Sequence, residues 1–334
     1  MGARAADVSV VLPVGGPHAA LERCLKSIAM LDPPPGEVVV VLDGVETELP
    51  PAAGEIGVRV VRLAKRCGPA VARNRGADAA RGSLLFFVDS DVELPTVTLG
   101  RALSALASDE QPAAVFGSYD DAPADPSLIS QYRNLLHHWV HQQAREEGST
   151  FFGACGMIRR EAFDEVGGFD ERFARPSVED IELGNRLRRA GYRVRLAKNL
   201  RVTHLKRWRA LEMLRTDLWR RAVPWTELML AEGELLDDLN LRRRDRVSVA
   251  LAWATLPAAI VGCWWPPLWA AAAAAALALL VLNRDFYGFL RRRRGTTFAL
   301  AALPWHWLYF LTCGAGFAIG WLRHALGRGM ELRR

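Results

Sequence analysis

The sequence predicts an α/β fold, with a mostly parallel sheet flanked by helices, over roughly residues 8–207. Short apolar runs alternate there with amphipathic stretches, which is the pattern of strand–helix–strand units. One run, Leu84–Val88, has five consecutive apolar residues and is typical of a strand buried on both faces. Beyond residue 246 the composition changes, and long uncharged stretches predict C-terminal transmembrane helices.

The predicted elements begin and end at residues that favour such boundaries. Pro13 and Gly15 stop the first strand, and Gly82 follows the second helix. The second strand ends at Asp43, in a turn-forming Asp-Gly pair. The predicted strands cover residues 8–12, 37–42, 58–63 and 84–88, and the predicted helices cover residues 19–29 and 69–80.

The turn after the first strand argues against a dinucleotide-binding domain. It reads PVGGP from Pro13, without the G-x-G-x-x-G pattern that such domains need, and the sequence has no Walker loop. A different nucleotide-binding α/β fold is therefore expected.

Two carboxylates, Asp89 and Asp91, follow the buried strand directly. Open α/β sheets bind ligands beyond the carboxyl ends of their strands, so these side chains lie where chemistry is expected. Carboxylate oxygens suit Mg²⁺ or Mn²⁺, and such ions commonly bind together with a phosphate. The motif therefore predicts a divalent cation beside a phosphate-bearing ligand.

A second pair of acids, Glu179 and Asp180, lies at the predicted start of a helix that ends near Gly191. One interpretation is capping, in which Ser177 and Asp180 form an S-x-x-D box. The other is that Asp180 points out of the helix start as a base, kept ionised by the helix dipole. Both can hold, with Glu179 or Ser177 capping and Asp180 reacting.

Several short segments occur in the same order as in a known family. They are LPV from Leu12, LDG from Leu42, ARNRGADAARG from Ala72, FFVDSDV from Phe86, GACGMIRREAFDEVGGFDERF from Gly153 and EDIELGNRLRRAGYRV from Glu179. Together they resemble family 2 glycosyltransferases of the GT-A fold over about residues 7–208. The resemblance implies transfer of a sugar from a nucleoside-diphosphate sugar, with inversion at the anomeric carbon.

The resemblance also implies roles for individual residues. Asp180 would be the general base that deprotonates the acceptor, Asp91 would bind Mn²⁺ or Mg²⁺, and Asp89 would contact the ribose or the metal. The residues that would bind the nucleotide are Pro13 and Val14, through their backbone, together with Asp43, which would bind the base, and Arg73. The alternatives are an ordinary turn at Asp43 and a solvated helix face at Arg73 or Arg75.

This division of roles agrees with the chemistry. Departure of a nucleoside diphosphate builds negative charge that a divalent cation stabilises, and a separate carboxylate must take the proton of the acceptor.

Three histidines raise the question of a further metal ligand. His204, in HLKRW, occupies the place of Gln in the Q-x-x-R-W motif of processive synthases, which weakens any prediction of processive synthesis. It is either an imidazole ligand of the metal or an ordinary loop histidine. His137 and His141 have zinc-site spacing but no evident third ligand, so a half-buried or acceptor-facing helix is expected. Cys155 is expected either to pack or to shape the sugar pocket.

The overall composition is basic, with a net charge of +6. Such a balance suits an anionic substrate, a membrane surface or nucleic acid. Arginine runs flank the apolar segments, so we expect a lipid bilayer as partner and no nucleic acid. The five cysteines are far apart, which argues against a disulfide framework and favours a reducing compartment. The N-terminal residues lack the apolar core of a signal peptide.

Composition divides the chain into three expected parts. Residues 1–208 would form the catalytic domain and residues 247–334 a membrane domain with two to three hydrophobic segments. Residues 209–246 would form an amphipathic helical connector, either packed on the catalytic domain or lying at the lipid surface with arginines on lipid phosphates.

The C-terminal part contains two long stretches without charge, residues 247–282 and 298–322. Apolar runs longer than ~18 residues are transmembrane candidates. Arg242–Arg246 and Arg291–Arg294 should share the cytoplasmic side, so the first stretch would cross twice and turn at Trp264–Pro267. The second stretch is either a span or an interfacial or re-entrant segment. The alternative for the whole region is a buried helical hairpin of a soluble domain.

The sequence thus predicts a membrane-anchored, metal-dependent, inverting glycosyltransferase at the inner (cytoplasmic) membrane, with its catalytic domain in the cytoplasm. The expected acceptor is a lipid or polyprenyl-phosphate-linked molecule of cell-envelope glycan or glycolipid synthesis. A growing polysaccharide or a soluble acceptor is the alternative. A sugar nucleotidyltransferase, which lacks its expected Gly-rich loop here, and a non-catalytic membrane protein are the other classes weighed.

Overall fold

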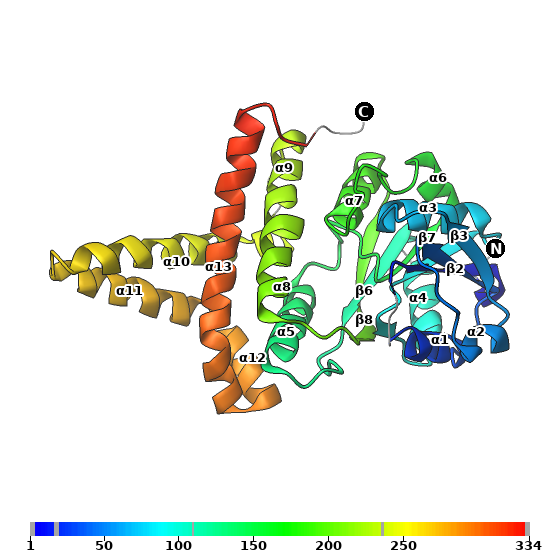
Figure 1. Ribbon diagram of the computed structural model, residues 1–334, viewed down its shortest axis with the longest axis horizontal. Helices are drawn as coiled ribbons and strands as arrows, with labels where there is room; N and C mark the ends of the chain where they lie inside the picture. The colour runs from blue at the N-terminus through cyan, green and yellow to red at the C-terminus, as the bar shows by residue number, and fades with distance from the viewer. Residues whose placement is uncertain (1–3, 17–19, 109, 235–236, 331–334) are drawn as a thin grey trace. The chain divides into compact units, whose positions relative to one another are not determined.

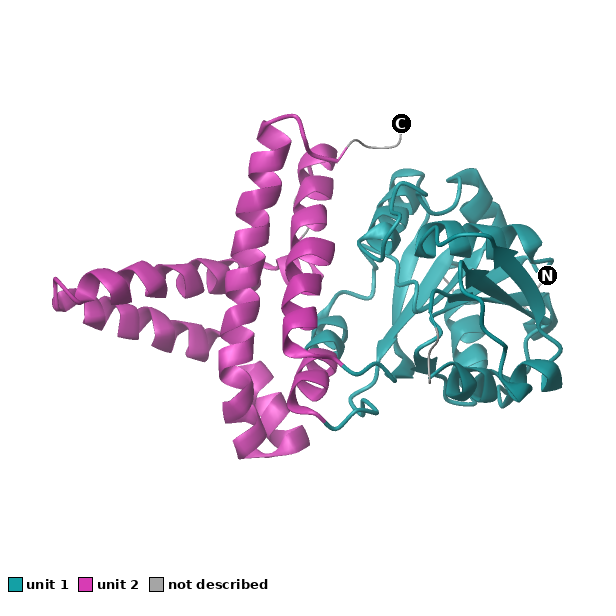
Figure 2. Cartoon of the chain, in the orientation of Figure 1, with its two compact units in different colours: residues 1–126, 136–207 teal, residues 127–135, 208–334 magenta. Residues whose placement is uncertain are grey.

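The computed structural model describes residues 4–16, 20–108, 110–234 and 237–330. The chain forms two compact units, shown in Figure 2. Unit 1 contains residues 1–126 and 136–207, and unit 2 contains residues 127–135 and 208–334. The chain passes between the units after residue 126, after residue 135 within helix α5, Leu128–Gln143, and after residue 207.

Unit 1 is built on one mixed sheet with the strand order β3-β2-β1-β4-β7-β6-β8-β5 (Figure 1). Strands β1 to β4 pair in parallel, as the sequence predicts, and so do β6 and β8. Strand β7 runs antiparallel to β4 and β6, and β5 runs antiparallel to β8. The strands are β1 Val8–Val14, β2 Glu37–Asp43, β3 Arg59–Leu63, β4 Leu84–Val88, β5 Val92–Glu93, β6 Ala114–Tyr119, β7 Cys155–Arg159 and β8 Val194–His204.

The four strands predicted from the sequence are confirmed within two residues at each end. The helix predicted over 69–80 is confirmed as α3, whereas the one predicted over 19–29 begins at Leu21, and its residue 19 lies outside the described residues. Apart from α5, the helices of unit 1 are η1 Ala5–Asp7, α1 Leu21–Ala29, α2 Pro51–Glu55, α3 Pro69–Ala79, α4 Thr98–Leu106, α6 Arg160–Glu165 and α7 Glu179–Arg189.

The core of unit 1 surrounds β4, whose residues are all buried. The Phe87 ring lies within 5.1–6.3 Å of the rings of Phe151, Phe163 and Phe169, which join β4 to the segments around β7. Helix α3 packs closely on β1, because a Cβ at Gly76 would lie only 2.4 Å from Val11 Cγ1. This packing fixes the strand ends from which the candidate site residues extend.

Unit 2 is helical. Helices α8, η2 and α9 follow one another without a break, and η2 has π-helical hydrogen bonding. Helix α13 packs on α9, with Gly316 and Gly320 allowing close approach to Ala222 and Thr226. The helices are α8 Ala210–Arg215, η2 Thr216–Ala222, α9 Val223–Glu232, η3 Leu239–Leu241, α10 Arg243–Gly262, α11 Pro267–Leu282, α12 Arg284–Arg294 and α13 Thr296–Ala325.

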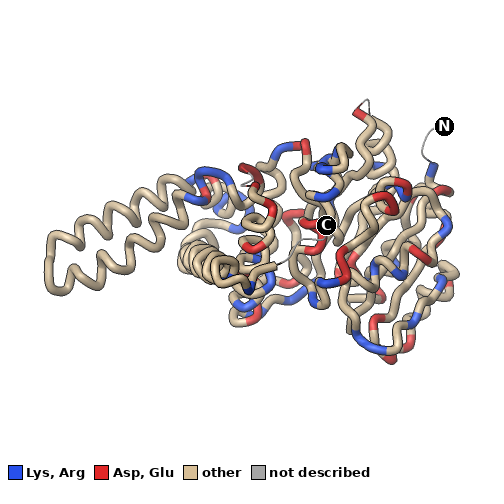
Figure 3. Tube along the Cα trace, turned by 90° about the horizontal axis from the view of Figure 1, so that it is seen from above, with Lys and Arg blue, Asp and Glu red and all other residues tan. Residues whose placement is uncertain are grey.

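Helices α10 and α11 form a hairpin that turns at residues 263–266, as the Trp-Trp-Pro-Pro segment predicts. Charged residues lie at its base and are absent along most of its length (Figure 3). Judged by length and apolar composition, no single helix among the described residues would span a membrane on its own. Helices α11 and α12 meet these length and composition criteria only as a pair, and the chain bends by 61° between them.

Candidate active site

The carboxyl ends of β1, β2 and β4 meet at one edge of the sheet, because these strands are parallel neighbours. Pro13 and Val14 are the last residues of β1 and pair with Val41 and Leu42 of β2. Their backbone therefore lies at the edge where nucleotides bind in open α/β sheets.

Asp43, the last residue of β2, holds the loop that leads into α3. Its Oδ1 accepts a hydrogen bond from the Cys67 amide at 2.6 Å, and its Oδ2 accepts one from the Gly68 amide at 2.9 Å. The next residue, Gly44, has φ +62°, the left-handed conformation that favours glycine. The ordinary turn considered from the sequence is thus present, and the Asp43 carboxylate is also held in place at the carboxyl edge of the sheet.

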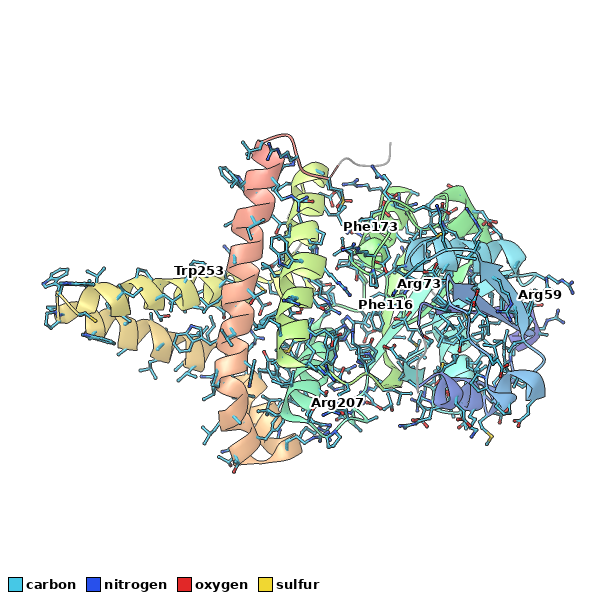
Figure 4. All side chains as sticks on the ribbon, in the orientation of Figure 1. Arg59, Arg73, Phe116, Phe173, Arg207 and Trp253 are labelled. Atoms are coloured by element: carbon cyan, nitrogen blue, oxygen red, sulfur yellow. The ribbon has the colours of Figure 1, made fainter. Side chains whose placement is uncertain are left out.

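Arg73 of α3 connects the two acidic motifs. Its Nη2 donates to Asp89 Oδ1 at 2.8 Å, and its Nη1 donates to Glu179 Oε1 at 3.0 Å (Figure 4 labels Arg73). The Arg73 side chain is only 5% exposed. The solvated helix face considered from the sequence is therefore wrong for Arg73. Arg75 does lie on the exposed face, paired with Asp78 and Glu171.

Burial and charge act in opposite directions in this cluster. Burial lowers the pKa of the Arg73 guanidinium, but the carboxylates of Asp89 and Glu179 outweigh it and hold that pKa above its ordinary value. Burial raises the pKa of the Asp89 carboxyl, and Arg73 opposes part of that rise. A Cβ at Gly153 would lie 2.8 Å from Arg73 Cζ, so glycine at this position leaves room for the guanidinium.

The adjacent acids Glu179 and Asp180 have different surroundings. Glu179 is buried, and its Oε2 accepts the Ser177 amide at 2.7 Å. Asp180 is half-buried, and its Oδ2 accepts the Gly153 amide at 3.3 Å. The N-cap residue of α7 is Val178, one position after Ser177, and it forms no side-chain cap hydrogen bond. Glu179 is therefore engaged in the buried ion pair with Arg73, whereas Asp180 is the more exposed of the two acids.

Asp91 and His204 lie side by side at the junction of β5 and β8. Their Oδ2 and Nε2 atoms are 3.5 Å apart, and the Leu205 amide donates to the Asp91 carbonyl at 2.8 Å. His204 pairs with Val92 at the end of β8, so it belongs to a strand and the plain loop interpretation is wrong. The Tyr119 ring stacks on the His204 ring, with centroids 4.1 Å apart and planes inclined by 6°.

The chemistry of this pair fits a divalent cation. A carboxylate oxygen and an imidazole nitrogen are donors that Mn²⁺ accepts, and their 3.5 Å separation suits two ligands of one ion. Within the described residues, no three His, Cys, Asp or Glu side chains are grouped as a complete site. The remaining ligands would then come from the substrate and water, as is common for ions that bind with phosphates.

Of three other side chains considered from the sequence, Cys155 and His141 are buried and His137 is half-buried. Cys155 is fully buried in β7, where burial raises its pKa above the ordinary value. His137 and His141 have ring centroids 4.3 Å apart and join an aromatic cluster with Tyr119 and Phe152. They therefore contribute to packing beside His204.

The sequence interpretation missed the Tyr119 ring and the Arg73–Glu179 pair. The partners of the pair are 106 residues apart, so no local pattern shows the contact. The sequence signal for the cluster is the Phe-Phe pair directly before Gly153, since Phe152 packs on Tyr119.

Comparison with known proteins supports a glycosyltransferase. Residues 9–167 match the family model "Glycosyl transferase family 2", and residues 133–209 match "N-terminal domain of galactosyltransferase". These matches cover the segments that carry Asp43, Arg73, Asp89, Asp91 and His204.

Two curated relatives and one solved structure are similar to the chain. An N-acetylglucosaminyl-diphospho-decaprenol L-rhamnosyltransferase from Mycobacterium tuberculosis is 29% identical over 227 residues, which cover 57% of this chain and 73% of that protein. An O-antigen biosynthesis protein from Myxococcus xanthus is 47% identical over 152 residues, covering 41% of this chain and 12% of that protein.

The solved structure is a mannosyltransferase from Pyrobaculum calidifontis in complex with GDP-Man and Mn²⁺. It superposes with a TM-score of 0.59 at 19% identity, covering 96% of this chain and 87% of that one. This likeness shows the fold. Together the family matches and the fold support a family 2 glycosyltransferase of the GT-A type.

Proposed function

We propose that this protein is a metal-dependent, inverting glycosyltransferase that moves a sugar from a nucleoside-diphosphate sugar to a lipid or polyprenyl-phosphate-linked acceptor. One observation carries the proposal. The Asp91–His204 pair and Asp180 belong to motifs that are joined through the Asp89–Arg73–Glu179 ion pairs. A cation-binding group and a separate base are the minimum for single-displacement transfer.

The donor would lie along the carboxyl edge of β1, β2 and β4. The backbone of Pro13 and Val14 and the carboxylate of Asp43 are at this edge. Asp91 and His204 would hold a Mn²⁺ or Mg²⁺ ion, and a bound divalent cation stabilises the negative charge of the departing diphosphate as a Lewis acid. The Arg73 guanidinium forms ion pairs with the carboxylates of Asp89 and Glu179. Its role is therefore to position Asp89 rather than to bind phosphate directly.

Asp180 would take the proton of the acceptor as the new bond forms. The amides of Gly153 and Ile181 donate to its two oxygens, at 3.3 and 2.9 Å, and it lies in the first turn of α7. Hydrogen-bond donors and a helix N-terminus both favour the ionised carboxylate, which is the form that accepts a proton. Direct attack by the acceptor opposite the leaving diphosphate inverts the anomeric carbon.

A membrane location is part of the proposal. The α10–α11 hairpin exposes large apolar side chains, among them Ile260 at 59%, Trp264 at 79% and Leu277 at 62%. Exposed apolar surface on this scale favours a lipid or protein partner. We place the protein at the inner membrane with its catalytic unit in the cytoplasm, because the arginine runs at 242–246 and 291–294 flank the hairpin.

The acceptor is inferred from this location and from one relative. A tethered transferase meets membrane-embedded acceptors at high effective concentration. The M. tuberculosis relative is named for a decaprenol-linked acceptor, and we extend that acceptor class to this chain. A growing polysaccharide is the second candidate, although His204 in place of Gln in the processive motif speaks against it.

The direct test is transfer by the full chain in membranes. Radiolabelled guanosine, uridine and thymidine diphosphate sugars are incubated with the membranes and Mn²⁺, and the products are partitioned between organic solvent and water. We expect one donor to label the organic phase, with the label lost when EDTA removes the cation. Label confined to water for every donor would contradict the lipid acceptor, and transfer insensitive to EDTA would contradict the metal site.

A further inference from the structure

Unit 2 contains an apolar pocket of about 360 Å³, here called the α13 pocket. Its walls come from α8, η2, α10 and α13. Trp219, Trp253, Leu308 and Leu311 are among its lining residues. Such a volume is near the lower end of ligand pockets, which run from roughly 300 to 1,000 Å³. The pocket therefore has room for one chain segment rather than for a two-chain phospholipid.

The tryptophan wall of the pocket is built into the packing of α10 on α13. Trp253 Nε1 donates to the Leu311 carbonyl at 3.1 Å, and Trp253 lies where α10 passes α13 (Figure 4). A Cβ at Gly314 would lie only 2.2 Å from Trp253 Nε1, so the glycine makes room for the indole. The indole N–H is thereby satisfied, and the ring presents apolar surface to the pocket.

The pocket contains a single cationic lining residue, Arg215. Within the part of the chain that the structure describes, no hydrogen bond or ion pair is formed by its guanidinium. Thr312, the polar neighbour in the lining, directs its hydroxyl to the Leu308 carbonyl at 2.7 Å. The pocket thus combines an apolar surface with the guanidinium of Arg215. These two features complement a ligand that has an apolar chain and an anionic head group.

We propose that the α13 pocket binds the first isoprene units of a polyprenyl phosphate, with Arg215 holding the phosphate. This inference rests on the proposed lipid-linked acceptor and deepens it, by assigning the acceptor's chain and head to named residues. The helix that carries Arg215 begins at Ala210, six residues after His204 in the chain.

The occupant follows from shape and charge together. A free phosphate would leave the apolar walls of Trp219, Trp253 and Leu308 in water, and a neutral hydrocarbon would leave Arg215 without an anion. A bilayer phospholipid carries two chains, which exceed the volume. A single-chain lipid phosphate satisfies both features.

The test is photolabelling of the full chain in detergent with a benzophenone-bearing polyprenyl phosphate. A matched polyprenyl alcohol probe lacks only the phosphate. We expect wild type to prefer the phosphate probe by at least about tenfold, because Arg215 would form a charge-assisted hydrogen bond with the phosphate. Labelled peptides should contain residues of the 308–315 segment.

Two variants separate head and chain recognition. Arg215→Gln, at an exposed side chain, should abolish the preference for phosphate over alcohol. Ala315→Phe adds bulk to the pocket lining and should reduce labelling by both probes at least about tenfold. The matched controls are Arg292→Gln on α12 and Ala318→Leu on the exposed face of α13, and both should keep wild-type labelling.

The outcomes also separate this inference from the proposed function. Unchanged preference in Arg215→Gln, or labelling that survives Ala315→Phe, overturns the pocket assignment. Equal protection by phosphatidylglycerol vesicles would show a bilayer-contact surface instead, and also overturns it. If the pocket assignment fails while membranes still label the organic phase with sugar, the proposed transferase stands. If no lipid receives sugar, the proposed acceptor fails whatever the probes show.

Discussion

At the residue scale, Asp91 and Asp89 differ although they are two positions apart. Asp89 is held by Arg73 at 2.8 Å, whereas Asp91 lies 3.5 Å from the imidazole of His204. Two donors of different type at this distance suit one cation, whereas the Asp89 carboxylate is engaged by the Arg73 guanidinium.

Asp91→Asn should therefore remove the dependence of donor binding on the cation. We expect the dissociation constant of a nucleoside diphosphate in the presence of Mn²⁺ to rise at least about tenfold, the scale of losing part of a metal's ligand set. Calorimetric titration with and without Mn²⁺ measures it. Asp78→Asn, whose side chain is 69% exposed, is the matched control. An unaltered response to Mn²⁺ in Asp91→Asn would rule out this ligand.

At the element scale, the buried Arg73–Glu179 pair joins α3 to α7. Both side chains are about 5–6% exposed, so the pair is shielded from water. Glu179→Gln keeps the shape but removes the charge, and leaves part of the Arg73 charge uncompensated. Hydrogen bonds to charged groups contribute about 1.5–3 kcal/mol.

Glu179→Gln should thus lower the stability of the protein by about 1.5–3 kcal/mol. Thermal unfolding of the full chain measures the change. The control is Glu22→Gln, at a half-exposed i,i+4 pair with Lys26, where less than about 0.5 kcal/mol is expected. Equal melting temperatures for the two variants would mean that the buried pair does not hold the helices together.

The start of β2 offers a pH-dependent contact at the same scale. Glu37 accepts hydrogen bonds from the Ser9 hydroxyl, at 2.7 Å, and from the Arg81 amide, and pairs with Arg59 at 3.5 Å. Burial raises the pKa of Glu37, but these donors outweigh it and hold the pKa below its ordinary value.

The sign of the linkage follows from that direction. A carboxyl with a depressed folded pKa stabilises the fold above its unfolded value of about 4.3, and this contribution is lost as pH falls through the folded value. Glu37→Gln should be less stable than wild type by about 1 kcal/mol at pH 7, with the difference shrinking below about pH 4. Denaturant unfolding at several pH values tests it, and a difference independent of pH would contradict the assignment.

At the scale of the whole molecule, some features could be predicted from sequence and others could not. Strands β1 to β4, and the end of β4 just before Asp89, follow from local apolar runs and turn residues. Strand β7 was not predicted, because its position is set by pairing with β4 and β6 and not by a long apolar run. The stacking of Tyr119 on His204 likewise depends on strand order, which no local pattern encodes.

The choice between Glu179 and Asp180 shows the same limit. Both acids fit a helix start and both fit a base, so the sequence leaves their roles open. The buried Arg73 guanidinium donates a hydrogen bond to Glu179, and the Gly153 amide donates one to Asp180. Tertiary contacts thus separate two residues that are neighbours in the chain.

The proposed mechanism requires that Asp180 acts as a base and does not bind the donor. The most direct measurement is a paired one on Asp180→Asn, donor affinity by calorimetry with Mn²⁺ and sugar transfer by membranes. We predict donor affinity within about twofold of wild type and transfer reduced by roughly 10²-fold or more, the scale of losing a general base. The exposed Asp164→Asn is the control and should match wild type in both. Near-normal transfer by Asp180→Asn would contradict the mechanism.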